Sequence, residues 1–143
     1  MIDDLKEKGI NTVAWINARD AFGQSGLPIL QKLAKPNGIE IVAVEDFDAS
    51  ATDMTVQLSK IKAKKTRRAH RLVENTGGGR GREKNFKQLG FTIPMLQSQA
   101  AANDAFLQQI GASGEGVLAQ GSKISIVDQL PESDYKKAIN PAQ

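Results

Sequence analysis

The chain of 143 residues contains no cysteine, which excludes disulfide bonds, thiol catalysis and cysteine-based zinc sites. No apolar run approaches the roughly 20 residues that a membrane-spanning helix needs, so we expect no insertion into a membrane. The single histidine, His70, has no second ligand or carboxylate pair near it, and we expect neither a metal site nor a general base there. Because no Ser-His-Asp set or paired-carboxylate motif is readable, the sequence predicts a protein that is not an enzyme and has no cofactor.

The charge is distributed very unevenly along the chain. Ten of the nineteen Lys and Arg residues lie between Lys60 and Lys84 with only two acids, which gives this segment a formal charge of +8 and leaves −5 for the rest. The segment includes Gly77-Gly-Gly-Arg-Gly-Arg82, which lacks the Gly-Lys-Ser/Thr ending of a phosphate-binding Walker loop. The basic segment is therefore either a nucleic-acid or membrane arm, or it does not belong to the fold around it.

Outside this segment, strand-like and helix-like patterns alternate. They predict helices at 2–8, 27–34, 53–64, 85–89 and 103–110, and strands at 11–17, 39–47, 92–96 and 116–119. We expect Pro28 in the first turn of its helix, and strand 39–47 covered on both faces. The alternation predicts the α/β class: a three-layer αβα sandwich with a mostly parallel sheet in a single lobe at 1–127, followed by a polar tail at 128–143.

The alternation breaks at one place, between the helices at 53–64 and 85–89. A strand would be needed at 66–73, where the sequence reads TRRAHRLV and four of eight residues are charged or titratable. Such a run is a poor buried strand. We expect this segment to loop out and to leave an exposed sheet edge that favours aggregation.

Four stretches of the chain carry a resemblance to a known family. They read TVAWINARDAFGQSGLPILQKLA, GIEIVAVEDFDASATDMTVQLSKIKA, KNFKQLGFTIPMLQSQAAANDAFLQQIG and EGVLAQG. Together they resemble the second lobe of the type I periplasmic solute-binding proteins of ABC transporters, the group of branched-chain amino-acid receptors. The resemblance implies a receptor that binds a small amino acid or an organic or aromatic acid between two lobes and delivers it to an ABC permease, in the periplasm.

The basic segment departs from the family pattern, which has a strand such as PDAIVVW at this point. A shifted reading frame permits KPDAHIVW over 65–72, so we hypothesise that residues 65–83 are a frameshifted translation closed by two compensating changes. The start MIDDLKEKG has no apolar core or cleavage site of a secretory signal. Since it resembles an internal helix of the family, we expect the chain to be a fragment or a product whose translation started downstream.

The resemblance also implies candidate ligand-binding residues, because ligands in open parallel sheets bind beyond the carboxyl ends of the strands. Phe22 stands where the family places an aromatic ring against the ligand; alternatively it packs under its own helix. Gln99, with Ala100 beside it, stands where amino-acid binders often carry a glutamate for the ligand's ammonium group, and a neutral side chain there fits an organic or aromatic acid as well as an amino acid. Asp20 either caps its loop or contacts the ligand.

Two functions follow from these observations. The first is the solute-binding component of an ABC importer, of which this chain supplies one lobe and therefore at most half of a cleft. We expect it to bind solute very weakly or not at all on its own. The alternative is a nucleic-acid-binding α/β module that uses the basic segment, but its support is charge alone, so no specific nucleic acid is expected.

Overall fold

The structure, a computed structural model, describes residues 1–64, 71–75, 82–121, 131 and 133. Within these ranges five parallel strands form one sheet in the order β2-β1-β3-β4-β5. The strands are β1 (Thr12–Ala18), β2 (Glu40–Phe47), β3 (Arg71–Asn75), β4 (Met95–Gln97) and β5 (Leu118–Ala119). The predicted α/β class with a parallel sheet is confirmed.

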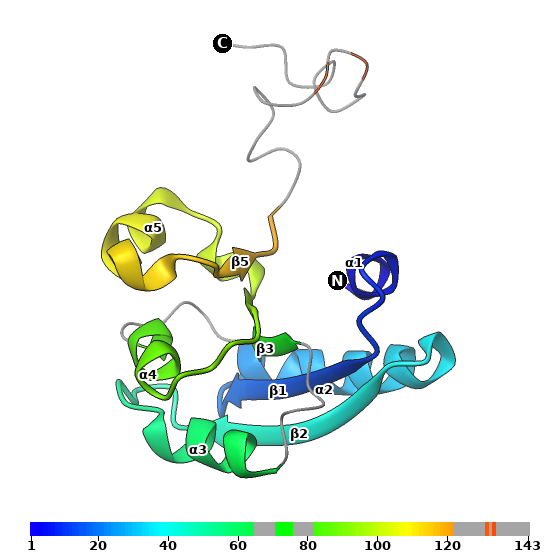
Figure 1. The fold of residues 1–143 in the computed structure, drawn as a ribbon, viewed down its shortest axis with the longest axis horizontal. Helices are drawn as coiled ribbons and strands as arrows, with labels where there is room; N and C mark the ends of the chain where they lie inside the picture. Colours follow the sequence, from blue (N-terminus) through cyan, green and yellow to red (C-terminus); the bar gives the residue numbers. More distant parts are fainter. Residues whose placement is uncertain (65–70, 76–81, 122–130, 132, 134–143) are drawn as a thin grey trace.

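Helices cover both faces of this sheet, with α2 behind it and α3 and α4 in front in the view of Figure 1. The α-helices are α1 (Ile2–Glu7), α2 (Ala21–Ala34), α3 (Thr55–Ala63), α4 (Arg82–Gln88) and α5 (Asp104–Ile110). Short 3₁₀ helices are η1 (Lys35–Asn37), η3 (Gln99–Ala101) and η4 (Gly111–Gly114). The predicted three layers are therefore present.

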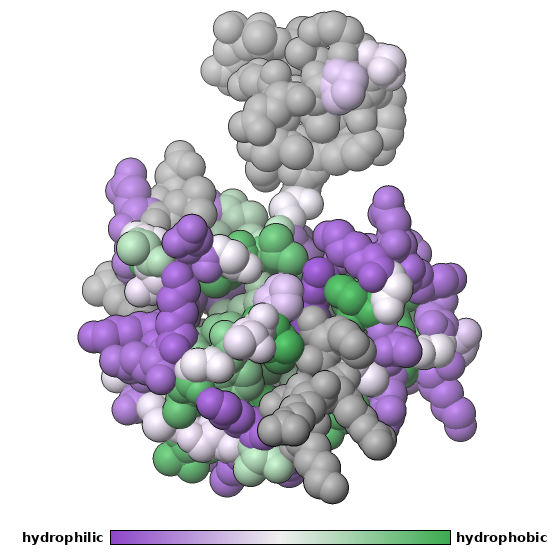
Figure 2. Space-filling view, in the orientation of Figure 1, coloured by the Kyte–Doolittle hydropathy of each residue, from purple (hydrophilic) through white to green (hydrophobic). Residues whose placement is uncertain are grey.

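The alternation of side chains along β1 produces two separate cores. Val13 and Trp15 pack into the core beneath α1 and α2, whereas Ala14 and Ile16 pack into the core beneath α3 and α4. All seven residues of β1 are buried, as a strand with helices on both faces requires. On the face shown in Figure 2, hydrophobic residues lie towards the middle and hydrophilic ones crowd the rim.

Helix α2 begins earlier than the sequence pattern predicts. The prediction began it at Leu27 with Pro28 in the first turn, but the helix starts at Ala21 and Pro28 lies inside it. Two glycines and a proline make this stretch a weak helix former by propensity, so packing against the sheet must stabilise it. Pro28 is exposed, which places its ring on the solvent side of the helix.

Three further predictions, for β2, for β4 and for the start of α5, can be compared with the structure. β2 pairs in parallel with β1 and packs into both cores through Ile41 and Ala43, but it is an edge strand. Several of its side chains, among them Val44, are exposed or half-exposed, so the expected cover on both faces is incomplete. β4 begins directly after Pro94, which keeps the proline out of the hydrogen-bonded ladder. Asn103, the first residue of the predicted helix 103–110, caps α5, because the backbone N–H of Phe106 donates to Asn103 Oδ1 over 2.9 Å.

The main correction concerns β3, which the sequence predicted to be missing. Residues 71–75 form a strand between β1 and β4, so no open edge is left at this point of the sheet. Leu72 faces the α3/α4 core and Val73 faces the α1/α2 core. The predicted window of 66–73 was placed too early, and residues 65–70 lie outside the described part of the chain.

Charged residues at the two ends of β3 are buried with partners. The guanidinium of Arg71 is 2% exposed and forms an ion pair with Asp4 of α1. At the other end Glu74 is 1% exposed and accepts a hydrogen bond from Gln97. The expectation that arginine would expel this strand is therefore wrong at position 71, because α1 brings a carboxylate to it from 67 residues away.

Candidate functional site

The parallel arrangement places the carboxyl ends of the strands at one edge of the sheet. We call this the carboxyl edge and define it by residues 17–22 at and after the end of β1, Glu74 one residue before the end of β3, and residues 97–101 at and after the end of β4. β3 separates β1 from β4, so the first and last groups lie two strand spacings apart, about 10 Å. A small ligand of that length can bridge them.

The end of β1 is fixed by side-chain hydrogen bonds. Trp15 Nε1 donates to Asn17 Oδ1 over 3.0 Å, and Asn17 Nδ2 donates to the carbonyl of Ala18 over 3.0 Å. Trp15 is 3% exposed, as expected for a core residue. These bonds hold the polar end of the strand rigidly beside the start of α2.

Asp20 is the N-cap of α2. Its Oδ1 accepts a hydrogen bond from the backbone N–H of Gly23 over 2.6 Å. Of the two roles considered for Asp20, the capping role is the one the geometry displays. A carboxylate at this helix end also interacts favourably with the helix dipole.

Gly23 allows α2 to approach the end of β1 closely. A Cβ atom at this position would lie 2.2 Å from the carbonyl oxygen of Ala18 and 2.7 Å from its nitrogen. Backbone atoms cannot move aside as a flexible side chain can. We therefore expect Gly23→Ala to lower the free energy of unfolding by about 1–3 kcal/mol in urea denaturation. Gly38→Ala is the control: Gly38 has a φ of +69° and no atom near its missing Cβ, so this variant introduces backbone strain but no clash. If both variants lose the same free energy of unfolding, the packing argument for Gly23 is contradicted.

The remaining predicted site residues are exposed or only partly described. Phe22 is 47% exposed in the first turn of α2, so its ring is not enclosed beneath the helix. Gln99 is exposed in η3, and Ala100 lies in the same 3₁₀ helix with its side chain outside the described part. Phe22 and Asp20 thus follow β1, whereas Gln99 and Ala100 follow β4. The structure places all four at the carboxyl edge in two groups.

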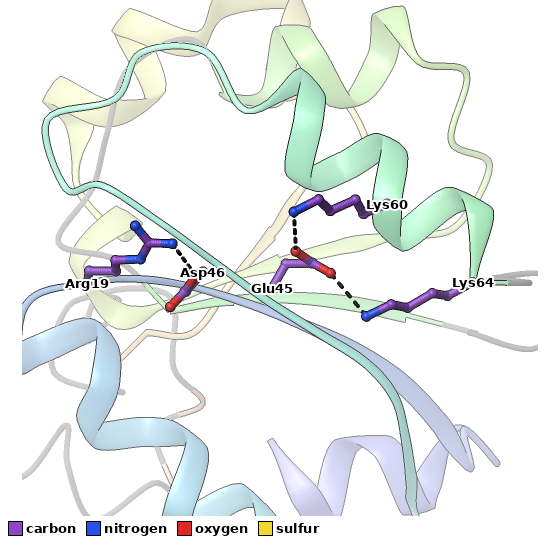
Figure 3. A network of polar contacts seen from close by, with 5 residues as sticks. All are labelled: Arg19, Glu45, Asp46, Lys60 and Lys64. Carbon is purple, nitrogen blue, oxygen red and sulfur yellow. Dashed lines mark hydrogen bonds and ion pairs between the residues drawn. The ribbon is translucent and has the colours of Figure 1, made fainter.

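Ion pairs join β2 to its neighbours beside this edge (Figure 3). Arg19 NH2 lies 2.9 Å from Asp46 Oδ1, and this hydrogen bond lowers the pKa of Asp46 and raises the pKa of Arg19. Glu45 receives Lys60 at 3.6 Å and Lys64 at 3.1 Å. The lysines are more than half exposed, so each pair contributes at most about 1 kcal/mol.

A buried polar cluster lies beneath the carboxyl edge, formed by Glu74, Glu83 and Gln97. Gln97 Nε2 donates to Glu74 Oε2 over 2.6 Å and to Glu83 Oε1 over 2.9 Å. All three residues are at most 2% exposed. The amide thus divides its two N–H groups between two carboxyl groups and connects β3, β4 and α4.

The sequence analysis did not identify this cluster. Local patterns mark neither Glu74 nor Gln97 as a buried residue. A signal was present, because Glu74 follows the apolar pair Leu72-Val73 as a strand-end residue would. Glu74 could have been recognised as a strand-end residue only if the strand had been predicted at 71–75.

A hollow of about 160 Å³ opens between α1, α2 and the sheet near this edge. Its lining combines apolar side chains with the polar groups of Glu74, Gln97, Ser98 and Gln120. Among the described residues no group of three or more His, Cys, Asp and Glu side chains is placed to hold a metal ion. In the same ranges no helix has the length and apolar character to cross a membrane.

No family model and no curated protein sequence matches the chain. Solved structures do match. An extracellular ligand-binding receptor from Rhodopseudomonas palustris superposes with a TM-score of 0.82 and 19% identity over 99% of this chain and 43% of that receptor. The fold is that of one lobe of a type I periplasmic solute-binding protein.

Two further structures of this type were solved with ligands. A branched-chain amino-acid ABC transporter protein from Thermus thermophilus with bound valine gives a TM-score of 0.71 and 20% identity, over 82% of this chain and 31% of that one. A solute-binding protein of an ABC transporter from R. palustris in complex with 4-hydroxybenzoate gives a TM-score of 0.72 and 17% identity, over 99% of this chain and 40% of that one. The chain thus spans less than half the length of each of these solute-binding proteins, and the fold that the resemblance implied is confirmed.

Proposed function

We propose that this chain is one lobe of the solute-binding component of an ABC importer and forms one wall of the cleft for a small amino acid or an organic or aromatic acid. The superposition over 99% of the chain with a ligand-binding receptor carries this proposal. Function in the periplasm and delivery to an ABC permease belong to the same proposal. So does the division into a lobe at 1–127 and a tail at 128–143.

The carboxyl edge is the proposed solute surface. Phe22 offers an exposed ring to an apolar or aromatic part of the solute, and Gln99 offers a neutral amide from η3. Ala100 adds a small neighbour to Gln99, and Asp20 holds the loop that carries Phe22. A neutral glutamine can accept a hydrogen bond from an ammonium group but does not neutralise its charge, and a buried charge without a counter-charge is costly, so the site favours solutes without a buried ammonium group.

The basic residues described near β3 support this function over nucleic-acid binding. Lys60 and Lys64 are paired with Glu45, and Arg71 is buried against Asp4. Lys62 donates to the carbonyl of Leu89 and lies 6.0 Å from the ring of Phe91. Cations that stabilise the fold in this way are less available to phosphate groups than free ones.

Nuclear magnetic resonance titration tests the proposal, because it detects binding too weak for calorimetry. With ¹⁵N-labelled chain and millimolar valine or 4-hydroxybenzoate, we expect fast-exchange shifts confined to residues 17–22 and 97–101. Since one lobe encloses only part of a solute, the Kd should be far above about 1 µM. A sub-micromolar Kd would contradict the half-cleft.

The control titration uses a short DNA duplex at low and high salt. Shifts around Lys60, Lys84 and their neighbours that disappear steeply with salt, together with no response to either solute, would replace the receptor proposal with the nucleic-acid one. Equal shifts along the whole chain with valine, 4-hydroxybenzoate and DNA would contradict both the receptor proposal and the nucleic-acid proposal.

The frameshift at 65–83 remains a prediction, since only 71–75 and Arg82–Glu83 of that range are described. The presence of β3 removes the argument that this stretch cannot enter the sheet. The DNA from well upstream of codon 1 through codon 90 tests the hypothesis directly. An insertion and a deletion that bracket these codons would support it, and a frame of this gene that runs intact through them from a true start at Met1 would refute it.

A further inference from the structure

The end of β4 is held both by the sheet and by helix α4. Gln97, the last residue of the strand, pairs in the ladder with Glu74 of β3, so the sheet itself sets the distance between these two residues. The backbone carbonyl of Gln97 accepts from the N–H of Gln120 over 3.2 Å, which ties the strand end to the chain after β5. The hydrogen bond to Glu83 differs from these contacts, because it joins the sheet to α4 over 2.9 Å.

The orientation of the Gln97 amide follows from its surroundings. Nε2 lies 2.6 Å from Glu74 Oε2 and 2.9 Å from Glu83 Oε1, and the reversed amide would place an oxygen against both carboxyl groups. The side chain is buried, so bulk water does not replace a lost partner. Removal of either carboxyl acceptor therefore leaves a buried N–H that is satisfied only if the side chain or the strand end moves.

Gln99, the proposed solute contact, lies in η3 immediately after this strand end. Ser98 has an extended backbone, and its carbonyl accepts from the N–H of Ala101 over 3.0 Å. The carbonyl of Gln99 accepts from the N–H of Ala102 over 3.1 Å. These bonds fix the shape of the turn, whereas its position relative to the sheet depends on Gln97 and on the buried Ala101.

We propose that Glu83 is a positioning residue of the solute surface, a role that rests on the proposed function: through Gln97 it holds η3 in the place where the Gln99 amide meets the solute. Glu83 is suited to this role because α4 is anchored independently of it, by Phe86 in the core that also contains Met95. The Glu83 side chain is buried beneath the carboxyl edge. It therefore acts through Gln97 and not by contact with the solute.

The paired variants Glu83→Gln and Glu83→Met test this role. Glutamine keeps an oxygen that accepts from Gln97, whereas methionine has a similar length and offers no oxygen. In titrations of ¹⁵N-labelled chains with valine or 4-hydroxybenzoate, we expect Glu83→Met to raise the Kd about fivefold, the worth of one neutral hydrogen bond, and Glu83→Gln to stay within about twofold of wild type. Urea denaturation gives the stability of each variant separately. A purely structural role would lower that stability and leave the Kd of the folded chain unchanged.

A measurement on the wild type keeps the test decisive if Glu83→Met does not fold. The side-chain N–H signals of Gln97 come from a buried group, so we expect them to shift with solute because η3 transmits the contact to the cluster. Equal Kd values for the two Glu83 variants, or Gln97 side-chain signals that stay unchanged while those of Gln99 shift, would overturn the positioning role alone. A wild-type chain that shows no shifts with either solute would overturn the proposed function and the role together.

Discussion

Replacing Asp4 by asparagine is expected to lower the free energy of unfolding at pH 7 by about 3 kcal/mol and the thermal midpoint by about 6–12 °C. Asp4 is the carboxylate that pairs with Arg71, whose side chain is 2% exposed in the middle of the sheet. Removal of one partner from a buried pair leaves a charge without compensation, which costs about 3–5 kcal/mol. The lower value applies because Asp4 itself is 37% exposed and water can reach part of the pair.

The matched control is Asp3→Asn in the same first turn of α1. Asp3 is exposed, so this variant removes the same favourable charge at the helix start without touching Arg71, and a change within about 0.5 kcal/mol is expected. Arg71→Met removes the buried charge itself. Since Arg71 Nε is buried without a hydrogen-bond partner among the described side chains, that variant should retain or exceed wild-type stability. Equal losses in Asp4→Asn and Asp3→Asn would contradict the argument.

The effect of Asp4 has a defined pH dependence. Hydrogen bonds from Lys8 and Arg71 lower the pKa of Asp4, although desolvation opposes them. A carboxyl group whose pKa is lower in the folded state stabilises the fold above its unfolded pKa of about 3.9, and this contribution is lost as the pH falls through the folded value. The difference in stability between wild type and Asp4→Asn should therefore be full at pH 7 and should shrink below about pH 4.

The sequence was sufficient for most of the fold because the relevant signals are local. The all-apolar run around Trp15 predicted a buried strand, and Asn103 predicted the start of α5. Where tertiary contacts override local preference, the prediction was displaced. Helix α2 starts six residues before Leu27 because Asp20 caps it and Gly23 packs on Ala18, and neither contact is visible in helix periodicity.

Strand β3, which the sequence analysis expected to be absent, shows more clearly how a distant contact can override a local pattern. Charge density in TRRAHRLV argued against a buried strand, and that argument is sound for an unpaired arginine. Its failure at Arg71 depends on Asp4, a residue 67 positions away that no local window includes. For the same reason Glu74, Glu83 and Gln97 could not be recognised as one cluster, since three different elements bring them together.

The candidate site likewise has a part that the sequence could indicate and a part that it could not. Asp20, Phe22, Gln99 and Ala100 were assigned by resemblance, and the parallel sheet places them all at one edge. Their contact with a solute remains a proposal, because it depends on a second wall that local sequence patterns do not describe. The buried cluster beneath them was missed, although it fixes the strand ends from which Gln99 and Ala100 follow.

Replacing Gln97 by leucine is expected to lower the free energy of unfolding by about 3 kcal/mol. The substitution removes two hydrogen bonds to carboxyl groups, each worth about 1.5–3 kcal/mol, and the interactions that Glu74 and Glu83 make elsewhere keep the total near the lower end of that sum. Gln99→Leu is the matched control, because it makes the same chemical change at an exposed position two residues away. Urea denaturation should show a loss for Gln97→Leu and a change within about 0.5 kcal/mol for Gln99→Leu.

The same two variants separate stability from solute binding. If Gln99 contacts the solute, Gln99→Leu should abolish the titration shifts at 97–101 while the protein remains as stable as wild type. Gln97→Glu adds a third carboxyl group to the buried cluster, where the neutral form is favoured, so its penalty should be large at pH 7 and should decrease as the pH falls towards about 4. A penalty of Gln97→Glu that is unchanged between these pH values would indicate that altered packing, rather than charge, destabilises the cluster.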